Sequence, residues 1–398
     1  MTDGQRNPRR NRMLLLTIPS HTKHQGKPRR VPSVTNLPTH PRDTGFEALE
    51  EIHAAAMRNL SPEVADFLET GAGTEQTLRA NQEAFGRWVI RPRPMSGVSV
   101  PRMSTTLLGI PLSVPVLTAP FGGDGLFGAE GHLAVARASA SCGTVSIVPE
   151  VGTFSFEQVR AAAPAAARIA QVHPFESFDR VARRIRAAGY DALCVTVDCA
   201  LPGFRVRNRV NRFTPDIGLF SGNVTGDGTP SVADLGGPLF SDEYPAWDWE
   251  RLSEATAMHG LPWIAKGILT RKAALAALDA GAAAIYVSSH GGRQVDPARA
   301  SLDALPEVAR AVSGKVPVLL DSGVRSGADV LLALALGADA VVVGRLAAYG
   351  LAAAGEAGVR RTIELLAEEL RALMILAGIP AVDQIPEGTV VERTVMTK

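Results

Sequence analysis

The chain has 398 residues, of which 46% are hydrophobic and 20% charged, and its formal net charge is +1. This composition is ordinary for a soluble globular protein, and the balanced charge gives no indication of binding to nucleic acid or to a membrane surface. No stretch approaches the roughly 18 apolar residues of a membrane span. The cysteines Cys142, Cys194 and Cys199 form no metal-ligand spacing and no disulfide framework, so we expect a cytoplasmic protein without a metal site.

Residues 1–42 differ in charge from the rest of the chain. They hold nine Lys and Arg against the single acidic residue Asp3, a net charge of +8, whereas the remaining residues carry −7. The segment is rich in proline and has almost no apolar periodicity, so it is predicted to be a disordered basic leader. Its apolar run at 13–18 is too short for a secretory signal. We interpret it as a disordered arm or as an extension from an upstream start codon, with nucleic-acid binding as a third option.

Residues 43–113 are predicted to form a helical lead-in, with helices near 45–57 and 62–69. From residue 114 onward, short β-branched or apolar runs alternate with alanine-rich segments of helical period. The predicted strands cover 114–119, 144–148, 168–170, 192–197, 263–265, 284–287, 316–320 and 340–343. The predicted helices cover 130–141, 177–188, 249–258, 271–280, 302–311, 327–335 and 356–377.

This alternation predicts the α/β class and a (β/α)8 TIM barrel over 114–385. An open doubly wound sheet would use fewer units and a glycine-rich first turn, and residues 119–125 do not fit G-x-G-x-x-G. The segment 206–247 is rich in Gly, Pro, Asn and Asp and is predicted to be an irregular lid loop after the fourth strand, over the active end. Residues 386–398 are predicted to be a C-terminal tail.

Polar residues cluster where the predicted strands end. His290 and Arg293 follow the strand at 284–287, and they pair a side chain that takes a proton near neutral pH with one that binds a carboxylate or phosphate. The loops at 321–327 and 344–345 follow the last two strands, where barrels often bind a phosphate. Their glycines allow the backbone to approach phosphate oxygens, and Arg325 and Arg345 add charge-assisted bonds.

Two further strands end in charged residues. Lys266 closes its strand either as a Schiff-base amine or as a fixed positive charge that can neutralise a reduced cofactor ring. Asp198 closes another and can orient an imidazole and stabilise its protonated form. Gln171, Thr196 and Ser288 are placed at the same end.

These motifs resemble the FMN-dependent 2-hydroxy-acid oxidase and dehydrogenase family, which includes glycolate oxidase, lactate oxidase, mandelate dehydrogenase and flavocytochrome b2. The similarity covers roughly residues 45–385. Its specific motifs are Ala-Lys-Gly at 265–267, Ser-Ser-His-Gly-Gly-Arg-Gln-Val-Asp at 288–296, Asp-Ser-Gly-Val-Arg-Ser-Gly at 321–327 and Val-Gly-Arg at 343–345.

The resemblance implies FMN as cofactor and gives roles to residues. His290 would be the base that takes the substrate proton, Asp198 its partner, and Lys266 the cation beside the flavin N1–C2 region. Arg205 and Arg293 would bind the substrate carboxylate. The implied cofactor-binding residues are Pro120, Gly122, Gln171, Thr196, Lys266, Ser288, Asp321, Gly323, Arg325, Gly344 and Arg345. A homo-oligomer, commonly a tetramer in the family, is also implied.

The chain departs from the family pattern at four positions that we also predict to bind substrate. Phe67 and His173 stand where the family usually has tyrosines, and Asp124 and Glu150 introduce carboxylates. We therefore expect oxidation of the CH–OH group of a 2-hydroxy acid or a related amine-bearing or polyhydroxylated substrate, in specialised-metabolite biosynthesis, with oxygen or another electron acceptor. The alternatives are a redox-neutral FMN-dependent isomerase-like barrel and a non-catalytic flavin-binding member.

Overall fold

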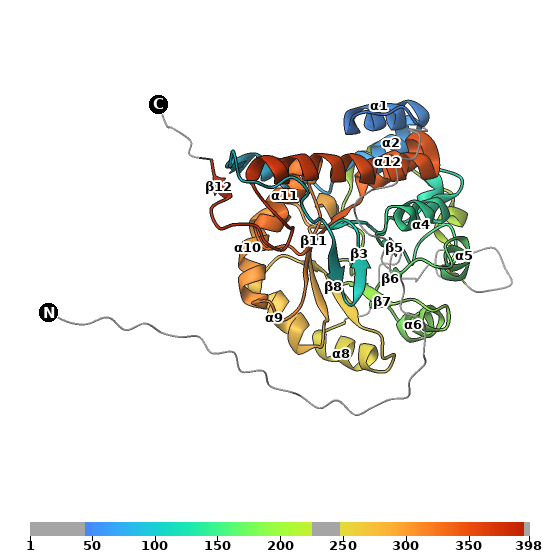
Figure 1. Ribbon diagram of the computed structural model, residues 1–398. Helices are drawn as coiled ribbons and strands as arrows, with labels where there is room; N and C mark the ends of the chain where they lie inside the picture. The colour runs from blue at the N-terminus through green and yellow to red at the C-terminus, as the bar shows by residue number, and fades with distance from the viewer. Residues whose placement is uncertain (1–43, 225–246, 394–398) are drawn as a thin grey trace. The chain divides into compact units, whose positions relative to one another are not determined.

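The computed structural model describes residues 44–224 and 247–393 (Figure 1). The predicted leader at 1–42 therefore lies outside the described residues. So do residues 225–246 of the predicted lid and the last residues of the predicted tail, 394–398.

Eight parallel strands close into a barrel in the order β10-β11-β4-β5-β6-β7-β8-β9. They are β4 (Val116–Thr118), β5 (Ser146–Val148), β6 (Arg168–Val172), β7 (Ala192–Thr196), β8 (Trp263–Ile268), β9 (Ala284–Val287), β10 (Val318–Leu320) and β11 (Ala340–Val343). Each strand pairs with its predecessor along the chain, and β11 closes the ring against β4. The predicted TIM barrel is confirmed.

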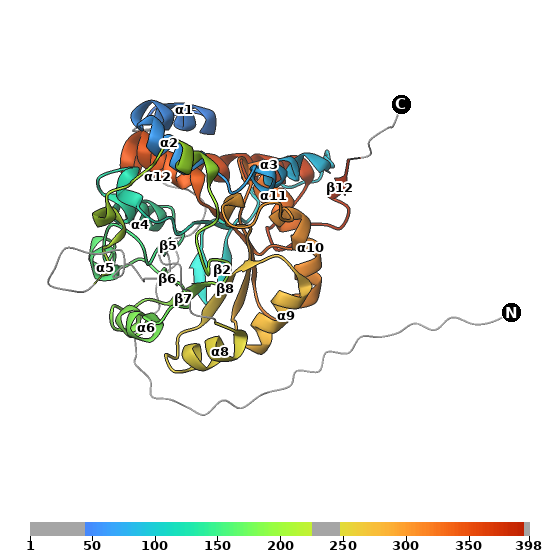
Figure 2. The same cartoon turned by 180° about the vertical axis from the view of Figure 1, so that it is seen from behind.

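A helix follows each barrel strand, and Figures 1 and 2 show these helices around the outside of the strands. They are α4 (Gly131–Ser141), α5 (Phe156–Ala162), α6 (Phe178–Ala187), α8 (Trp249–Ala257), α9 (Arg271–Asp279), α10 (Ser301–Val312), α11 (Gly327–Ala335) and α12 (Arg345–Ala377). Helix α6 illustrates the pattern, because Phe178, Val181 and Ile185 recur at helical spacing and are buried against the barrel while its arginines face outward.

The amino end of the barrel is closed by a hairpin of β2 (Thr105–Leu107) and β3 (Ile110–Leu112), which leads directly into β4. Leu107 and Leu112 pack in one buried cluster with inward side chains of the strands, such as Leu117 and Tyr286. Apolar side chains therefore fill this end of the barrel, and ligands of such barrels bind at the carboxyl ends of the strands.

The lead-in contains α1 (Leu49–Asn59) and α2 (Pro62–Glu69), the two helices that the sequence predicts, and also α3 (Gln76–Glu83) and the short turn η1 (Phe85–Arg87). Helix α1 packs against α12 (Figure 1). Strand β1 (Trp88–Ile90) pairs antiparallel with β12 (Val390–Glu392). The segment predicted as a tail from residue 386 therefore contains a strand, which is too short to give a periodic signal.

The described part of the predicted lid, residues 206–224, has two short helical elements, and the residues between and after them form turns and irregular structure. It contains α7 (Val206–Val210) and the 3-10 turn η3 (Ile217–Phe220); two similar turns, η2 (Asp124–Leu126) and η5 (His290–Gly292), lie at the barrel end. Helix α7 lacks an apolar stripe, and tertiary contacts hold it instead. The Arg207 side chain donates to Glu75 of the lead-in at 2.8 Å.

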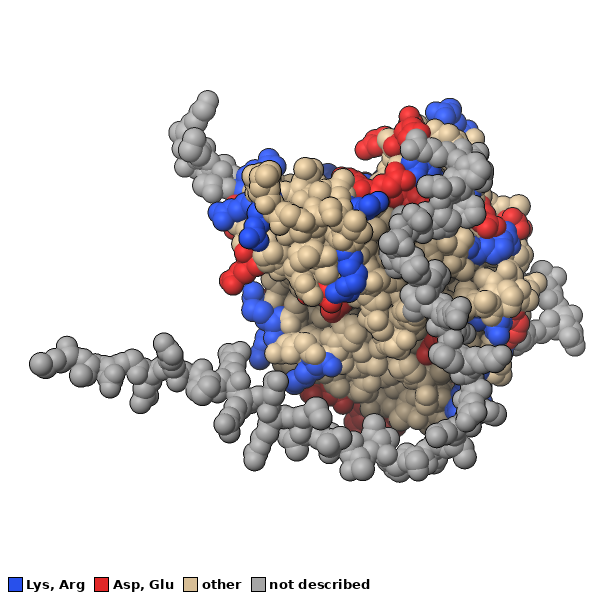
Figure 3. All heavy atoms as spheres, viewed as in Figure 1, with Lys and Arg blue, Asp and Glu red and all other residues tan. Residues whose placement is uncertain are grey.

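Helix α12 also begins earlier than predicted, at Arg345 instead of 356, and leaves helical geometry briefly at Ala354 and Gly355. None of the described helices is long and apolar enough to cross a membrane. Figure 3 shows basic and acidic side chains interspersed along the edges of the viewed face, with uncharged surface between them.

Candidate active site

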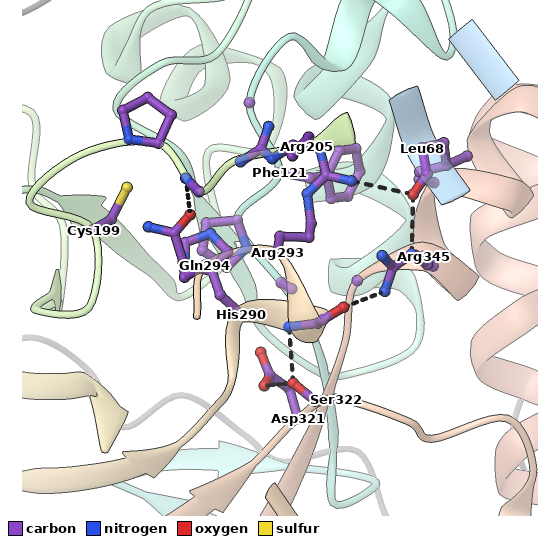
Figure 4. A pocket seen from close by; sticks show the side chains of 18 of the residues that line it. Leu68, Phe121, Cys199, Arg205, His290, Arg293, Gln294, Asp321, Ser322 and Arg345 are labelled. Atoms are coloured by element: carbon purple, nitrogen blue, oxygen red, sulfur yellow. Dashed lines mark hydrogen bonds between the residues drawn. The ribbon is translucent and has the colours of Figure 1, made fainter. Parts of the chain in front are cut away.

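A cavity of about 1080 Å³ opens at the carboxyl end of the barrel (Figure 4). The loops after seven of the strands contribute to it, from Pro120 after β4 to Arg345 after β11, and β8 contributes Lys266 from within the strand. This is the end of a TIM barrel where ligands bind, because side chains from different strands converge there. The predicted residues that line it are Phe67, Pro120, Gly122, His173, Asp198, Arg205, Lys266, His290, Arg293, Asp321, Gly323, Arg325, Gly344 and Arg345.

His290, Asp198 and Lys266 meet in this cavity. The His290 Nδ1 atom lies 3.2 Å from Oδ1 of Asp198 and 3.4 Å from Nζ of Lys266. Burial and the Lys266 charge lower the pKa of His290, and Asp198 opposes them in part. Burial alone would raise the pKa of Asp198, but Lys266 and His290 outweigh it and lower that pKa to about 2. A neutral imidazole is thus held beside a permanent carboxylate, the pairing of a general base with its stabilising anion.

The backbone at His290 is fixed by its surroundings. Its φ of +56° is the left-handed region, which is costly for a residue with a side chain. Two hydrogen bonds hold this turn: the His290 N–H donates to Ser288 Oγ and the Gly291 N–H donates to Ser322 Oγ, each at 3.0 Å. Ser288 and Ser322 thus fix the turn, and glycine suits positions 291 and 292 because their φ values are also positive.

Four arginines extend along the cavity. Burial is the main cause that lowers the pKa values of Arg205, Arg293 and Arg345. A neighbouring arginine of this group of four lowers each of these pKa values further. Arg325 is the neighbour of Arg345. Buried like charges are unfavourable unless anions compensate them, so the row favours a ligand set with several negative charges.

Arg293 and Arg345 also join the lead-in to the barrel (Figure 4). Arg293 Nη1 donates to the carbonyl of Phe67 at 2.7 Å, and Arg345 Nε donates to that of Leu68 at 2.9 Å. Both residues line the cavity, but these donors are directed to backbone oxygens. In contrast, the Arg205 Nε atom is buried without a partner in the described part of the chain, so it can bind a ligand oxygen.

The loops after β10 and β11 form the end of the cavity that suits a phosphate. The first N–H groups of a helix lack intrahelical acceptors, and α12 begins at Arg345 beside Gly344. Gly323 has a φ of +96°, and a Cβ there would lie 2.1 Å from the Asn81 carbonyl oxygen, so only glycine fits. Asp321 beneath them accepts hydrogen bonds from Tyr286 and Ser322.

Gln171, Thr196 and Ser288 are buried at the strand ends and do not line the cavity themselves. The Gln171 amide donates to Thr196 Oγ1 at 3.0 Å. Their predicted contact with an isoalloxazine ring stays a prediction.

Asp124 does not lie where the sequence-based expectation puts it. It is fully buried, and its carboxylate accepts from the backbone N–H groups of His132 at 2.6 Å and Thr153 at 2.7 Å. Its other neighbour is the buried His132 ring, whose Nδ1 is 3.4 Å away. Asp124 therefore stabilises the turn after β4 and does not contact the cavity, which corrects the expectation of a substrate contact.

Glu150 does not line the cavity either, because it turns toward His173. Its Oε2 atom lies 3.0 Å from the His173 Nδ1 atom and accepts from the His173 N–H at 2.8 Å. Of the two carboxylates expected to bind substrate, Asp124 therefore stabilises a turn and Glu150 binds His173.

Six phenylalanines form an apolar wall in the cavity: Phe67, Phe121, Phe127, Phe204, Phe213 and Phe220. The ring of Phe67 lies 4.8 Å from that of Phe213, and the Arg293 guanidinium is 5.0 Å from the centre of the Phe67 ring. A cationic group beside an apolar surface suits a ligand that has a carboxylate and an apolar side chain.

Phe213, Phe220 and Asn208 also line the cavity and were not predicted from the sequence. All three lie in the segment interpreted as a lid, where no periodic pattern marks them. Both polar side-chain atoms of Asn208 are buried without a partner among the described residues. The available signal in the sequence was that Asn208 follows Arg205, a predicted substrate-binding residue, by three positions.

The donors of this cavity fit FMN: backbone N–H groups and arginines at one end suit its phosphate, and the buried Lys266 suits the ring, where negative charge develops on reduction. Fold and site together define a flavin-dependent oxidoreductase of the TIM-barrel class. The comparisons with known proteins lead to the same class. The sequence profile described as FMN-dependent dehydrogenase matches residues 56–392, and the chain belongs to this family.

Similar proteins support this membership. The peroxisomal (S)-2-hydroxyacid oxidase GLO3 of Arabidopsis thaliana is 39% identical over 86% of this chain and 95% of its own length. An L-lactate oxidase of Nostoc sp. is 41% identical over 83% of this chain and 94% of its own. A crystal structure of a mandelate oxidase variant with 2-hydroxy-phenylacetamide has a TM-score of 0.79 and 36% identity, covering 88% of this chain and all of that one.

The chain is therefore an FMN-dependent 2-hydroxy-acid oxidoreductase that acts on a CH–OH group. The expectations of FMN as cofactor and of an enzyme are confirmed. The alternatives of a redox-neutral barrel and of a non-catalytic flavin-binding member have no support in these similarities.

Proposed function

We propose that the protein oxidises 2-hydroxy acids with an aromatic or other bulky apolar side chain, with oxygen as the electron acceptor. The observation that carries this proposal is the His290–Asp198 pair, 3.2 Å apart, in a cavity that Arg205, Arg293 and the phenylalanine wall also line. When bound, FMN supplies a two-electron acceptor.

Each side chain has a role that follows from its surroundings. His290, kept neutral by burial and Lys266, takes a proton from the substrate, and Asp198 stabilises the imidazolium that results. Arg205 and Arg293 hold the carboxylate by charge-assisted hydrogen bonds. The phenylalanines exclude water and receive the apolar side chain of the substrate.

An amine-bearing or polyhydroxylated substrate has less support. That expectation, and with it a role in specialised-metabolite biosynthesis, depended on Asp124 and Glu150 in the cavity. Asp124 is buried outside it, and Glu150 is bound to His173. An apolar wall beside an arginine favours a plain carboxylate with an apolar substituent instead.

Oxygen is proposed as acceptor because the relatives described above are named as oxidases. A homotetramer and a cytoplasmic location stay predictions, and relatives named as peroxisomal exist. Light scattering of the purified protein would test whether it is a tetramer.

Anaerobic bleaching of the flavin band tests the proposal. We expect mandelate and phenyllactate to bleach the holoprotein faster than lactate or glycolate, and amino- or polyhydroxy-substituted acids to bleach it least. His290→Ala should keep its flavin and lose bleaching by every acid. Equal bleaching by glycolate and mandelate would contradict the assigned substrate class, and normal turnover of His290→Ala would contradict the assigned base.

A further inference from the structure

Asn208 is a residue of the cavity whose polar groups no contact described so far explains. Its side chain lines the cavity, yet its Oδ1 and Nδ2 atoms are both buried and have no hydrogen-bond partner in the described part of the chain. A buried amide without partners costs free energy, so a native protein that keeps one usually completes it with a ligand or a water. The cavity beside Asn208 is where such a ligand binds.

The unpartnered atoms of the cavity lie together at one end of α7. Of the cavity-lining residues in the described part of the chain, only Arg205 and Asn208 have buried side-chain polar atoms without a partner. Arg205 is the N-cap residue of α7, and Asn208 is the third residue of this helix. Side chains at these two positions of a helix lie on the same side, so both belong to one polar subsite.

Other residues hold α7 in place, so the fold does not need the Asn208 side chain for this purpose. The Arg207 side chain donates to Glu75 at 2.8 Å, and Asn211 Nδ2 donates to Asp66 Oδ2 at 3.1 Å. These two bonds attach α7 to the lead-in on a side that does not line the cavity. Asn208 is thus placed beside the cavity with its amide available to a ligand.

We propose that Asn208 is a further substrate-binding residue, whose amide N–H group donates to the carboxylate that Arg205 also binds. A carboxylate has about four acceptor sites and can accept from both side chains. The Asn208 oxygen can then accept from the Arg205 guanidinium, which carries five donors. The amide is covered in the structure, and rotation about χ2, which is broadly distributed in asparagine, turns it toward the cavity.

The surroundings of this subsite favour a carboxylate over a neutral group. Burial and the charge of Arg205 lower the pKa of Arg293, so the two guanidinium groups repel each other and an anion compensates both. The Arg293 Nη1 atom already donates to the carbonyl groups of Phe67 and Thr70, at 2.7 and 3.0 Å. Part of its donor capacity is therefore used, and Asn208 supplies a further donor for the carboxylate.

This inference rests on one part of the proposed function, the binding of the substrate carboxylate by Arg205. It does not depend on the apolar side chain of the substrate, on the electron acceptor or on the assigned base. Its test can therefore use carboxylates that lack the 2-hydroxyl group and do not react.

The experiment titrates phenylacetate and propionate into the FMN-loaded full chain and follows the flavin absorbance. Asn208→Leu keeps a similar shape without polar atoms, and it should raise the Kd of both carboxylates by about 10- to 100-fold, the equivalent of one bond to a charged group. The neutral phenylacetamide should lose much less affinity. An unchanged Kd for the two carboxylates would overturn the proposal.

Kinetics and stability give a second readout of Asn208→Leu. With 2-hydroxy acids as substrates, KM should rise by a similar factor while kcat stays nearly the same, because the bond exists before and during the reaction. The melting temperature without substrate should not fall, since leucine replaces a buried amide that has no partner. A lower melting temperature with an unchanged KM would indicate a structural amide and would contradict the proposal.

Two further variants control for shape and for loosening of α7. Asn208→Asp keeps the shape but adds a negative charge, so both carboxylates should bind at least as weakly as to Asn208→Leu. Asn211→Leu removes the bond to Asp66 on the same helix, and it should lower the melting temperature with a much smaller effect on the Kd values. If Asn211→Leu weakens carboxylate binding as much as Asn208→Leu, the effect comes from a loosened helix and the proposal is wrong.

The pair of carboxylates separates this inference from the proposed function. If phenylacetate binds to the wild type no more tightly than propionate, the proposed preference for apolar side chains fails. Equal losses of both ligands in Asn208→Leu would still support a bond to their common carboxylate. A loss confined to phenylacetate would instead place Asn208 beside the substrate side chain and overturn the inference.

Discussion

The Nδ1 atom of His290 lies 3.2 Å from Asp198 and 3.4 Å from Lys266, so one ring nitrogen faces an anion and a cation together. Together with burial, the cation keeps the imidazole neutral before reaction, because both lower its pKa. The anion stabilises the ring after it has accepted a proton. Lys266 and Asp198 thus act on different protonation states of the same base.

This arrangement predicts the pH dependence of the reaction. His290 must be neutral to accept a proton, and its pKa is lowered from the ordinary 6.5. We therefore expect the acid limb of kcat/KM to have its midpoint below pH 6.5. The measurement is kcat/KM over about pH 4 to 9.

A variant of Asp198 tests whether this carboxylate helps to set the pKa of His290. Asp198→Asn removes the group that raises the His290 pKa, so the acid limb should move further down while kcat falls by about 10²- to 10⁴-fold. Asp383→Asn, at an exposed ion pair with Arg102, should change neither. An acid limb at or above pH 6.5 in the wild type would refute the assigned base.

Removal of an arginine from the end of the cavity that suits a phosphate is predicted to weaken FMN binding. Arg325→Ala removes a cation beside Arg345 at the loop after β10, so FMN should bind about 10- to 100-fold more weakly, the equivalent of one charge-assisted bond. The ratio of flavin to protein absorbance and an FMN titration of the apoprotein measure this. Arg299→Ala serves as control, because Arg299 is exposed and pairs with Glu307. Equal FMN affinity in both variants would remove Arg325 from the cofactor site.

Asp124 gives a prediction about stability and not about catalysis. Its carboxylate is charged when folded, because hydrogen bonds and His132 overcome burial and lower its pKa. A lowered folded pKa stabilises the protein above the unfolded pKa, and this contribution disappears as the pH falls through the folded value.

Asp124→Asn should therefore reduce the free energy of unfolding at neutral pH by about 1.5–3 kcal/mol, the net value of bonds to a charged group. KM should not change, because the residue does not line the cavity. Chemical denaturation and steady-state kinetics measure the two quantities. A raised KM at unchanged stability would restore Asp124 as a substrate contact.

The sequence predicted the barrel because each strand and helix carries its own local period, and the loops after the strands must meet at one end. His290, Asp198 and Lys266 were therefore predictable as neighbours. The orientation of Asp124 and Glu150 was not, because tertiary partners decide it: His132 and Thr153 for the first, and His173 for the second. Helix α7 was missed for the same reason, since contacts with the lead-in hold it.

Phe67 predicts how substrate preference can be changed. Its ring packs on Phe213 and lies under Arg293, which is proposed to hold the substrate carboxylate. Phe67→Tyr adds a hydroxyl beside this arginine. A new bond to a carboxylate is worth about 1.5–3 kcal/mol, so KM for small acids such as glycolate and lactate should fall by about 10- to 100-fold.

Acids with bulky apolar side chains should gain less from Phe67→Tyr, because the added oxygen must be desolvated against the phenylalanine wall. The ratio of kcat/KM for lactate to that for mandelate should therefore rise. Phe204→Tyr is the control, since Phe204 lines the same cavity but is 58% exposed and its hydroxyl would stay in water. If Phe67→Tyr leaves this ratio unchanged while flavin content and stability are normal, Phe67 does not set the substrate preference, and the apolar wall contributes only to packing.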